Sequence, residues 1–157
     1  MKKQFMLISL IAALLLLQSC NQNITRNALK EINLKEHKIK MYKSMHCGCC
    51  GIYGEYLQNL GFDVEVTDLH DVAEIKEKHS IPQQMLSCHT MEVDGYFIEG
   101  HVPAEAIAKL LSEKPDIKGI ALPGMPSGTP GMHGGKQGEW VIYALNKDGS
   151  TREFTRV

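Results

Sequence analysis

Three cysteines lie within four residues of one another, in the segment His46-Cys47-Gly48-Cys49-Cys50-Gly51. Residues 38–43, just before it, alternate apolar and polar side chains, which predicts a short strand. Residues 52–60, just after it, repeat apolar side chains every three or four positions, which predicts a helix. The fold must therefore place three thiols together at the N-terminus of a helix that follows a strand.

This position and spacing indicate the chemistry of the thiols. Unpaired backbone N–H groups and the positive end of the helix dipole favour the thiolate, which is the form that binds metals or attacks disulfides. Cys47 and Cys50 have the C-x-x-C spacing of a thiol–disulfide exchanger or of half a zinc site. Cys49 fits neither arrangement, because a third thiol invites mispairing and the adjacent Cys49 and Cys50 aim poorly at one tetrahedral ion. Three clustered thiolates suit a soft ion that accepts bridging sulfur, Cu(I) first of all.

The rest of the chain predicts an α/β fold. Further segments have strand or helix patterns: strands at residues 62–66, 87–93 and 96–99, and a short helix at residues 71–79. Asp94-Gly95 predicts a hairpin turn, and Pro103 opens a helix with an apolar face. The resulting order, β-α-β-α-β-β-α, is that of a thioredoxin-like core with the cysteine cluster after its first strand.

The C-terminal third begins with a segment rich in glycine and proline, residues 118–138. It is longer than ordinary connections, so we expect it to be functional or mobile. Residues 140–145 and 151–157 flank Asp148-Gly149, which predicts a final hairpin.

The N-terminal segment predicts export. Lys2 and Lys3 precede an apolar run at residues 5–17, which is shorter than the roughly 20 residues of a membrane-spanning helix and suits a signal peptide. The run ends in Leu17-Gln18-Ser19-Cys20, which resembles a bacterial lipoprotein cleavage site. We expect cleavage before Cys20 and lipid attachment to it, with plain secretion and a free Cys20 as the alternative.

This N-terminal prediction divides the chain into a signal peptide (1–19), a polar tether (20–36) and a folded domain (37–157). Cleavage removes two lysines and no acid, so the formal charge changes from −1 to −3. A charge of this size gives no reason to expect a nucleic-acid partner. The expected location is the bacterial cell envelope, either anchored to the membrane by lipid or in the periplasm.

A fourth thiol, Cys88, lies in Leu86-Ser87-Cys88-His89-Thr90 at the start of the third predicted strand. In thioredoxin-like folds the loop before this strand packs against the active-site loop. By that analogy we expect Cys88 and His89 to face the cysteine cluster.

Four sequence elements follow one another along the chain: CGCC, SCHT, DGYFIEGHVP and LPGMPSGTPGM. Together they resemble the CopG-type family of extracytoplasmic copper-resistance proteins, over residues 38–157. The resemblance implies a thioredoxin-like fold, a copper cluster bridged by cysteine thiolates, and interconversion of Cu(I) and Cu(II). It also implies a ligand set: Cys47, Cys49, Cys50 and Cys88. Met45-His46 departs from the family pattern and could extend the copper site.

Other side chains are weaker candidates. The accessory ligands that we expect are His89, Met125, Met132, His46 and Met45. For Met125 and Met132 the alternative is that they pack the glycine- and proline-rich loop against the domain. Met85 stays undecided between core and site. The remaining candidates are expected to be structural: His101 near a helix start, Met41 and Met91 in the core, Tyr53 and Tyr56 on a helix face, and His37, His70 and His79 on the solvated surface. For His101 the alternative is contact with the site.

Three functions compete. The favoured one is a copper-binding protein for copper resistance or copper handling. It would hold several Cu(I) ions, with zinc less favoured, and would have a copper-handling or redox protein as partner. The second is a thiol–disulfide oxidoreductase that uses Cys47 and Cys50. The third is a structural lipoprotein stabilised by disulfides or zinc. The sequence thus favours a metal-binding protein over a conventional enzyme, and leaves copper oxidoreductase activity open.

Overall fold

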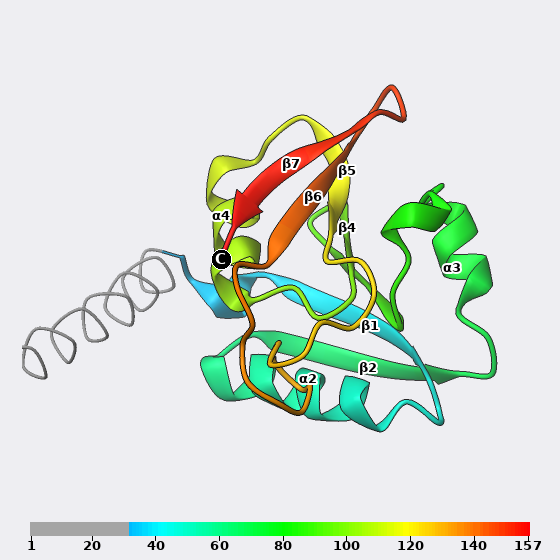
Figure 1. Ribbon diagram of the computed structural model, residues 1–157, viewed down its shortest axis with the longest axis vertical. Helices are drawn as coiled ribbons and strands as arrows, with labels where there is room; N and C mark the ends of the chain where they lie inside the picture. The colour runs from blue at the N-terminus through cyan, green and yellow to red at the C-terminus, as the bar shows by residue number, and fades with distance from the viewer. Residues whose placement is uncertain (1–31) are drawn as a thin grey trace, which may run out of the picture.

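The computed structural model describes residues 32–157 as an α/β fold built on one seven-stranded sheet (Figure 1). The predicted signal peptide, Cys20 and most of the predicted tether lie outside the described residues. Ile32 and Leu34 pack against the core, so the packed part of the chain begins before residue 37. Within the described part of the chain, no helix is long and apolar enough to cross a membrane.

The elements follow one another in the predicted order β-α-β-α-β-β-α, and three more strands follow. They are η1 (Leu34–Glu36), β1 (Lys38–Ser44), α2 (Gly48–Leu60), β2 (Asp63–Leu69), α3 (Ala73–Lys78), η2 (Gln83–Met85), β3 (His89–Val93), β4 (Tyr96–Glu99), α4 (Ala104–Glu113), β5 (Ile117–Ala121), β6 (Val141–Asn146) and β7 (Thr151–Arg156). The α/β prediction is confirmed, as are both hairpins.

The sheet has the order β2-β1-β3-β4-β5-β6-β7. β1 and β2 are parallel and are joined through α2, and β4 and β5 are parallel and are joined through α4. The other neighbours are antiparallel. The cysteine-bearing N-terminus of α2 therefore starts from β1, directly beside β3.

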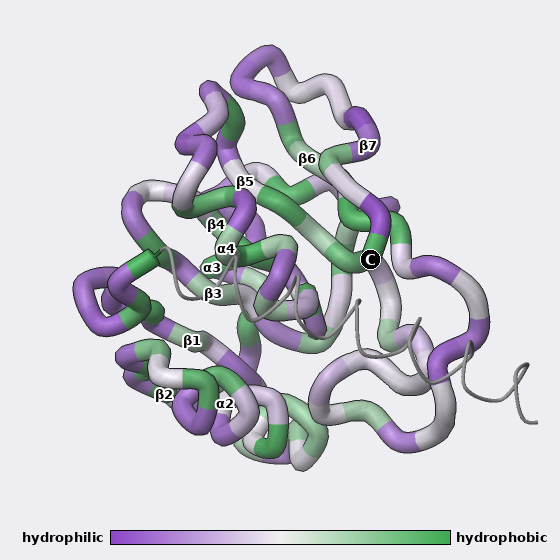
Figure 2. The backbone as a smooth tube through the Cα atoms, turned by 90° about the vertical axis from the view of Figure 1, so that its left-hand side faces the viewer, coloured by the Kyte–Doolittle hydropathy of each residue, from purple (hydrophilic) through white to green (hydrophobic). Residues whose placement is uncertain are grey.

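Alternating side chains give the sheet two apolar faces. Ile98 and Ile120 join the larger core with Tyr53 and Leu57 of α2 and the apolar face of α4. Their neighbours Phe97 and Ala121 point the other way, into a smaller core. The Figure 2 colouring shows the central strands and α4 as largely apolar and the β6–β7 turn as polar. Met41, Met91 and Met85 are all buried, which settles Met85 as a core residue.

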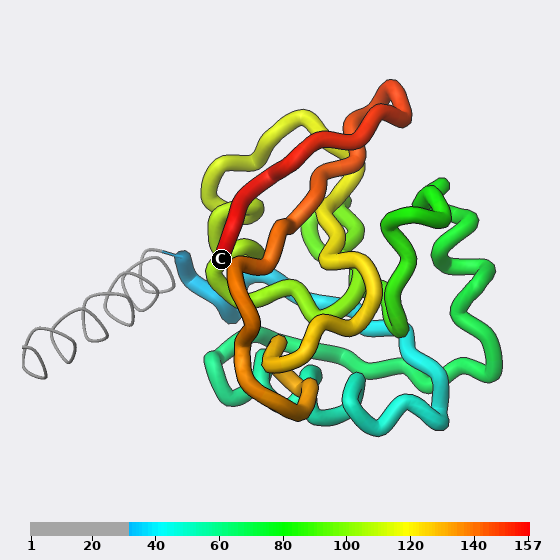
Figure 3. The backbone as a smooth tube through the Cα atoms, viewed as in Figure 1, coloured from blue at the N-terminus to red at the C-terminus, as the bar shows by residue number. Residues whose placement is uncertain are grey.

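The structure corrects the interpretation of residues 118–138. Their beginning belongs to β5, a buried strand between β4 and β6, and the irregular connection starts only after Ala121. Gly119 concealed the strand in the sequence, but it is needed there, because a Cβ would collide with the Phe97 carbonyl. Beyond β5 the chain runs towards α2 before it returns to β6, as the yellow-to-orange tube in Figure 3 shows.

Three smaller predictions were wrong in part. Ile52 was expected on the buried face of its helix but is 50% exposed. His37 and His79 were expected on the solvated surface but are half-buried, where they pair with Asp94 (2.6 Å) and Glu92 (2.7 Å). The hydrogen bond between each ring and its carboxylate explains why a polar ring is retained there.

A buried ion pair links α3 to the centre of the sheet. The Glu99 carboxylate at the end of β4 has no exposed surface, and it accepts hydrogen bonds from the Lys76 ammonium and from the Thr90 hydroxyl (2.6 Å). The same carboxylate accepts a hydrogen bond from the Ser87 backbone N–H (2.6 Å). Removing one partner of such a pair leaves a buried charge without compensation.

We therefore expect Lys76→Met to lower the free energy of unfolding by about 3–5 kcal/mol, because Glu99 stays buried without its cation. Chemical denaturation followed by circular dichroism measures the change. The matched control is Lys38→Met, since Lys38 forms an exposed pair with Glu65 and should leave stability nearly unchanged. Equal effects of the two substitutions would contradict the structural role of the pair.

Candidate metal centre

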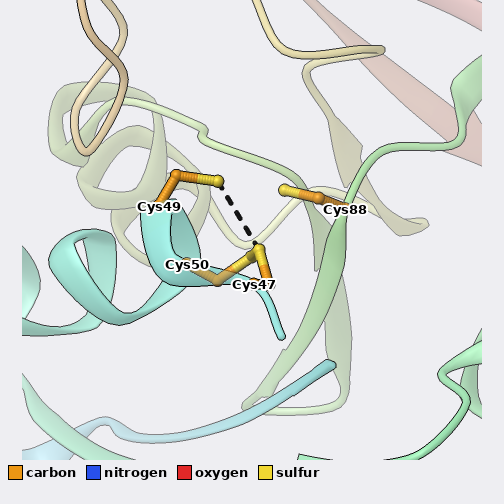
Figure 4. Close-up of side chains that lie close together, drawn as sticks. All are labelled: Cys47, Cys49, Cys50 and Cys88. Carbon is orange, nitrogen blue, oxygen red and sulfur yellow. Dashed lines mark hydrogen bonds between the residues drawn. A yellow bond between two sulfur atoms is a disulfide. The ribbon is translucent and has the colours of Figure 1, made fainter. Parts of the chain in front are cut away.

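Four cysteine sulfurs converge at the N-terminus of α2. Cys47 is the N-cap residue, Cys49 and Cys50 lie in the first turn, and Cys88 approaches from the segment before β3 (Figure 4). All four sulfurs lie within 4.8 Å of one another. The structure thus brings together every cysteine of the expected ligand set. Cys50 is fully buried, and the other three are half-buried.

Two of the sulfurs are bonded to each other. Cys47 and Cys50 form a disulfide, while Cys49 and Cys88 are free thiols. The Cys49 sulfur lies 3.5 Å from that of Cys47 (Figure 4). In this oxidation state the site offers two thiols, and reduction of the disulfide would raise the number to four.

The Cys88 loop is held by backbone contacts on both sides. Glu99 binds the Ser87 N–H, and the Gly124 N–H donates to the Leu86 carbonyl (3.0 Å). The Ser87 hydroxyl donates in turn to the Gly124 carbonyl. Residues far apart in the sequence therefore determine where the Cys88 sulfur points.

The loop between β5 and β6 covers the other side of the site. Gly131 has a positive φ of +82°, and a Cβ there would lie 2.8 Å from the Cys49 carbonyl oxygen. Only glycine allows the loop to pack so closely on the first turn of α2. Met132 follows it and is half-buried, whereas Met125 is 54% exposed. Met45 and His46 are exposed in the turn before α2, so among the accessory candidates His89 alone has a described contact with a cysteine sulfur.

Two fully buried histidines flank Cys88. The Nδ1 atom of His89 lies 3.3 Å from the Cys88 sulfur, and the Nε2 atom of His101 lies 3.1 Å from it. The Tyr53 ring packs against both imidazoles, with centroid distances of 4.9 and 5.0 Å. Its hydroxyl donates to the Val102 carbonyl (2.6 Å), which holds the ring in place.

The position of His101 differs from the favoured sequence interpretation, a structural residue near a helix start, and agrees with the alternative that it touches the site. In the β3–β4 hairpin Thr90 pairs with Glu99, so the next residues, His89 and Gly100, face each other. The Gly100 N–H donates to the His89 carbonyl (3.0 Å). Counting the register outwards from the Asp94-Gly95 turn would have placed His101 opposite Cys88, and that signal was present in the sequence.

Burial favours the neutral forms of these groups. Burial and, to a smaller extent, the neighbouring Cys49 together raise the pKa of Cys88 to about 11. Burial also lowers the pKa of His101, and it lowers that of His89 well below the ordinary range, with His101 contributing. Neutral imidazole is the form that binds metals, and a metal ion would take the place of the thiol proton.

Two solved structures resemble the chain over most of its length. One is described as "Copper resistance protein copG- Form 1", with 37% identity and a TM-score of 0.70 over 76% of this chain and 96% of that one. The other, "Copper resistance protein copG- Form 2", has 37% identity and a TM-score of 0.72 over 77% and 98%. The profile of the family described as "Protein of unknown function, DUF411" matches residues 85–132, which include Cys88 and both histidines. No curated protein matches the chain.

The raised pKa of Cys88 predicts slow, strongly pH-dependent alkylation. In a Cys49→Ser variant with the disulfide intact, the rate with iodoacetamide should rise about tenfold per pH unit from pH 7 and continue to rise above pH 9, because the thiolate is the nucleophile and burial, the larger cause of the raised pKa, remains. Mass spectrometry of quenched samples measures the rate.

The raised pKa of Cys88 also makes the stability of the folded protein depend on pH. Since the folded pKa lies above the ordinary value of 9.0, the contribution of Cys88 is fully present below pH 9 and is lost as the pH rises towards 11. An alkylation rate that levels off near pH 9 would contradict this environment for Cys88.

Proposed function

The chain belongs to the family of the copper resistance protein CopG, and from this premise we propose that it holds copper ions in a cluster of cysteine thiolates, for resistance to excess copper or for copper handling. One observation carries the proposal: the sulfurs of Cys47, Cys49, Cys50 and Cys88 come from two distant segments into one group within 4.8 Å. Copper is the cargo of this site.

The donor chemistry fits copper in its reduced state. Thiolates are soft ligands that select Cu(I), and closely spaced sulfurs can bridge ions. Four thiolates around a single monovalent ion would leave three negative charges without compensation in a half-buried site. Several Cu(I) ions compensate these charges, so we propose a multinuclear cluster rather than a single ion.

The disulfide couples copper binding to the redox state of the protein. Two electrons and two protons convert the Cys47–Cys50 disulfide into two thiols, and deprotonation then makes both available as ligands. Oxidation back to the disulfide withdraws half of the sulfur ligands. This arrangement supports a role in interconverting Cu(I) and Cu(II), with a copper-handling or redox protein as partner.

We also propose that the protein works in the bacterial cell envelope. This rests on the signal-like segment at residues 1–19 and on Cys20, which would carry the lipid that anchors the domain through the tether at residues 20–36. Outside the cytoplasm thiols tend to be oxidised, so bound Cu(I) would also protect the four cysteines.

Anaerobic titration of the fully reduced protein with Cu(I) tests the cluster. We expect several copper ions per chain, bound cooperatively, because bridging sulfurs link the ions. Cys49→Ser should lower the copper content and abolish the cooperativity. Metal analysis and mass spectrometry of the intact complex measure both. The control is His70→Gln, an exposed histidine outside the site, and binding of no more than one Cu(I) by the unmodified protein would overturn the proposal.

A second candidate function is thiol–disulfide exchange, which the Cys47–Cys50 disulfide favours. Cys47 is the more accessible partner and Cys50 is fully buried. In the reduced enzyme the Cys47 thiolate would attack a substrate disulfide, release one substrate thiolate and form a mixed disulfide. Cys50 would then displace the second substrate thiolate and regenerate the Cys47–Cys50 bond.

This candidate predicts that reduction of insulin by dithiothreitol is accelerated by the protein and that the acceleration survives Cys49→Ser but not Cys47→Ser. The turbidity of precipitating insulin chains measures the rate. Cys88→Ser is the control, because Cys88 has no part in the exchange. Activity that disappears in the Cys49→Ser variant would count against exchange by the C-x-x-C pair.

A further inference from the structure

We propose that Cys88, His89 and His101 form a second metal site, for one divalent ion of borderline softness such as Zn(II) or Cu(II). This site shares Cys88 with the thiolate cluster but needs neither Cys47 nor Cys49. The proposal rests on the geometry around Cys88 and goes beyond copper storage in the cluster, and it stands whether or not the cluster forms.

His101 is oriented as a metal ligand. Its Nδ1 atom lies 2.7 Å from the Pro130 carbonyl oxygen, which can only accept, so Nδ1 carries the proton. The Nε2 atom of the neutral ring then presents a lone pair to the Cys88 sulfur at 3.1 Å. A backbone carbonyl on the far ring nitrogen is the usual way in which proteins fix the tautomer of a ligating histidine. The proton shared by Cys88 and His101 occupies the place that a metal ion would take.

His89 lacks a complete set of partners. Its ring is fully buried, its Nδ1 atom faces the Cys88 sulfur, and its Nε2 atom has no hydrogen-bond partner in the part of the chain that the structure describes. Buried polar atoms without a partner are rare in native proteins because their desolvation is uncompensated. The Nδ1 atom is therefore the donor that His89 presents to an ion, and Nε2 would carry the proton of the neutral ring.

The separations fit donors of a single ion. For metal–sulfur and metal–nitrogen bonds of about 2.3 and 2.0 Å at a tetrahedral angle, sulfur and nitrogen are about 3.5 Å apart. The two observed separations of 3.1 and 3.3 Å differ from that value by a few tenths of an ångström. One ring nitrogen of His89, one ring nitrogen of His101 and the Cys88 sulfur all lie within 4.8 Å of one another. The contacts of Tyr53 with both rings keep them near this arrangement.

The ligand types indicate which metal binds. Two imidazoles and one thiolate form a harder set than four thiolates, and imidazole suits Zn(II) and Cu(II). Cys50 lies within the same group of atoms, but its sulfur is engaged in the disulfide. The oxidised protein therefore offers three protein ligands and one open position. The site remains available in the redox state in which the thiolate cluster cannot form.

Anaerobic titration with Co(II), which substitutes for Zn(II) and can be observed by absorption, tests the site. The protein for this experiment carries Cys47→Ser, Cys49→Ser and Cys50→Ser, so that Cys88 is the only thiol left in the described domain. We expect one Co(II) per chain with thiolate-to-cobalt charge-transfer and tetrahedral d–d absorption, and displacement by Zn(II). Adding His101→Gln or His89→Gln should weaken binding at least about tenfold, and adding Cys88→Ser should remove the charge-transfer band.

The matched control is His79→Gln, which removes a half-buried histidine that pairs with Glu92 outside the site and should leave Co(II) binding unchanged. If the triple variant does not fold by circular dichroism, the unmodified protein with its disulfide intact serves instead, with the same bands expected. Absence of thiolate–cobalt absorption in folded protein, or binding that is insensitive to both histidines, would overturn the proposal. Because Cu(I) is not used, this outcome is independent of the Cu(I) titration of the cluster.

Discussion

The geometry of the site depends on one buried carboxylate. Glu99 at the end of β4 accepts hydrogen bonds from the Lys76 ammonium, the Thr90 hydroxyl and the Ser87 backbone N–H, and so joins α3, β3 and the Cys88 loop. A charge that is fully buried must keep such partners, because their loss exposes a large desolvation cost. This requirement fixes the loop before β3 against the sheet. Cys88 consequently lies opposite the N-terminus of α2, where the other three cysteines are held.

Around this anchor the site combines two kinds of donor. On one side are the sulfurs of the helix N-terminus, two of which are joined as a disulfide, and on the other are two buried imidazoles. Cys88 belongs to both groups: its sulfur lies within 4.8 Å of the other three sulfurs and within 3.3 Å of a nitrogen of each imidazole. The thiolate side suits several soft Cu(I) ions and the mixed side suits one borderline ion. The redox state of Cys47 and Cys50 then decides which set of ligands is complete.

Much of the fold was predictable because its signals are local. The helix after the cysteines, the Asp94-Gly95 hairpin and the helix after Pro103 each follow from periodicity or turn chemistry within about a dozen residues. The strand β5 was missed because Gly119 weakens its pattern, and the reason for that glycine is the Phe97 carbonyl of the neighbouring strand. The site position of His101 was only the less favoured alternative, because it depends on the hairpin register and on the Pro130 carbonyl, which comes from a distant segment.

The sequence by itself determined which donors exist and how soft they are: three thiols at a helix N-terminus, a fourth thiol next to a histidine, and a glycine- and proline-rich loop of the length needed to cover a site. These follow from residue type and short-range spacing. Only the tertiary structure decided which donors meet. The sulfurs of Cys50 and Cys88 are 38 positions apart in the chain, and strand pairing and the buried Glu99 bring them within 4.8 Å. Burial, which sets the protonation of Cys88 and both histidines, is likewise a property of the packed molecule, because it depends on every segment that excludes water from the site.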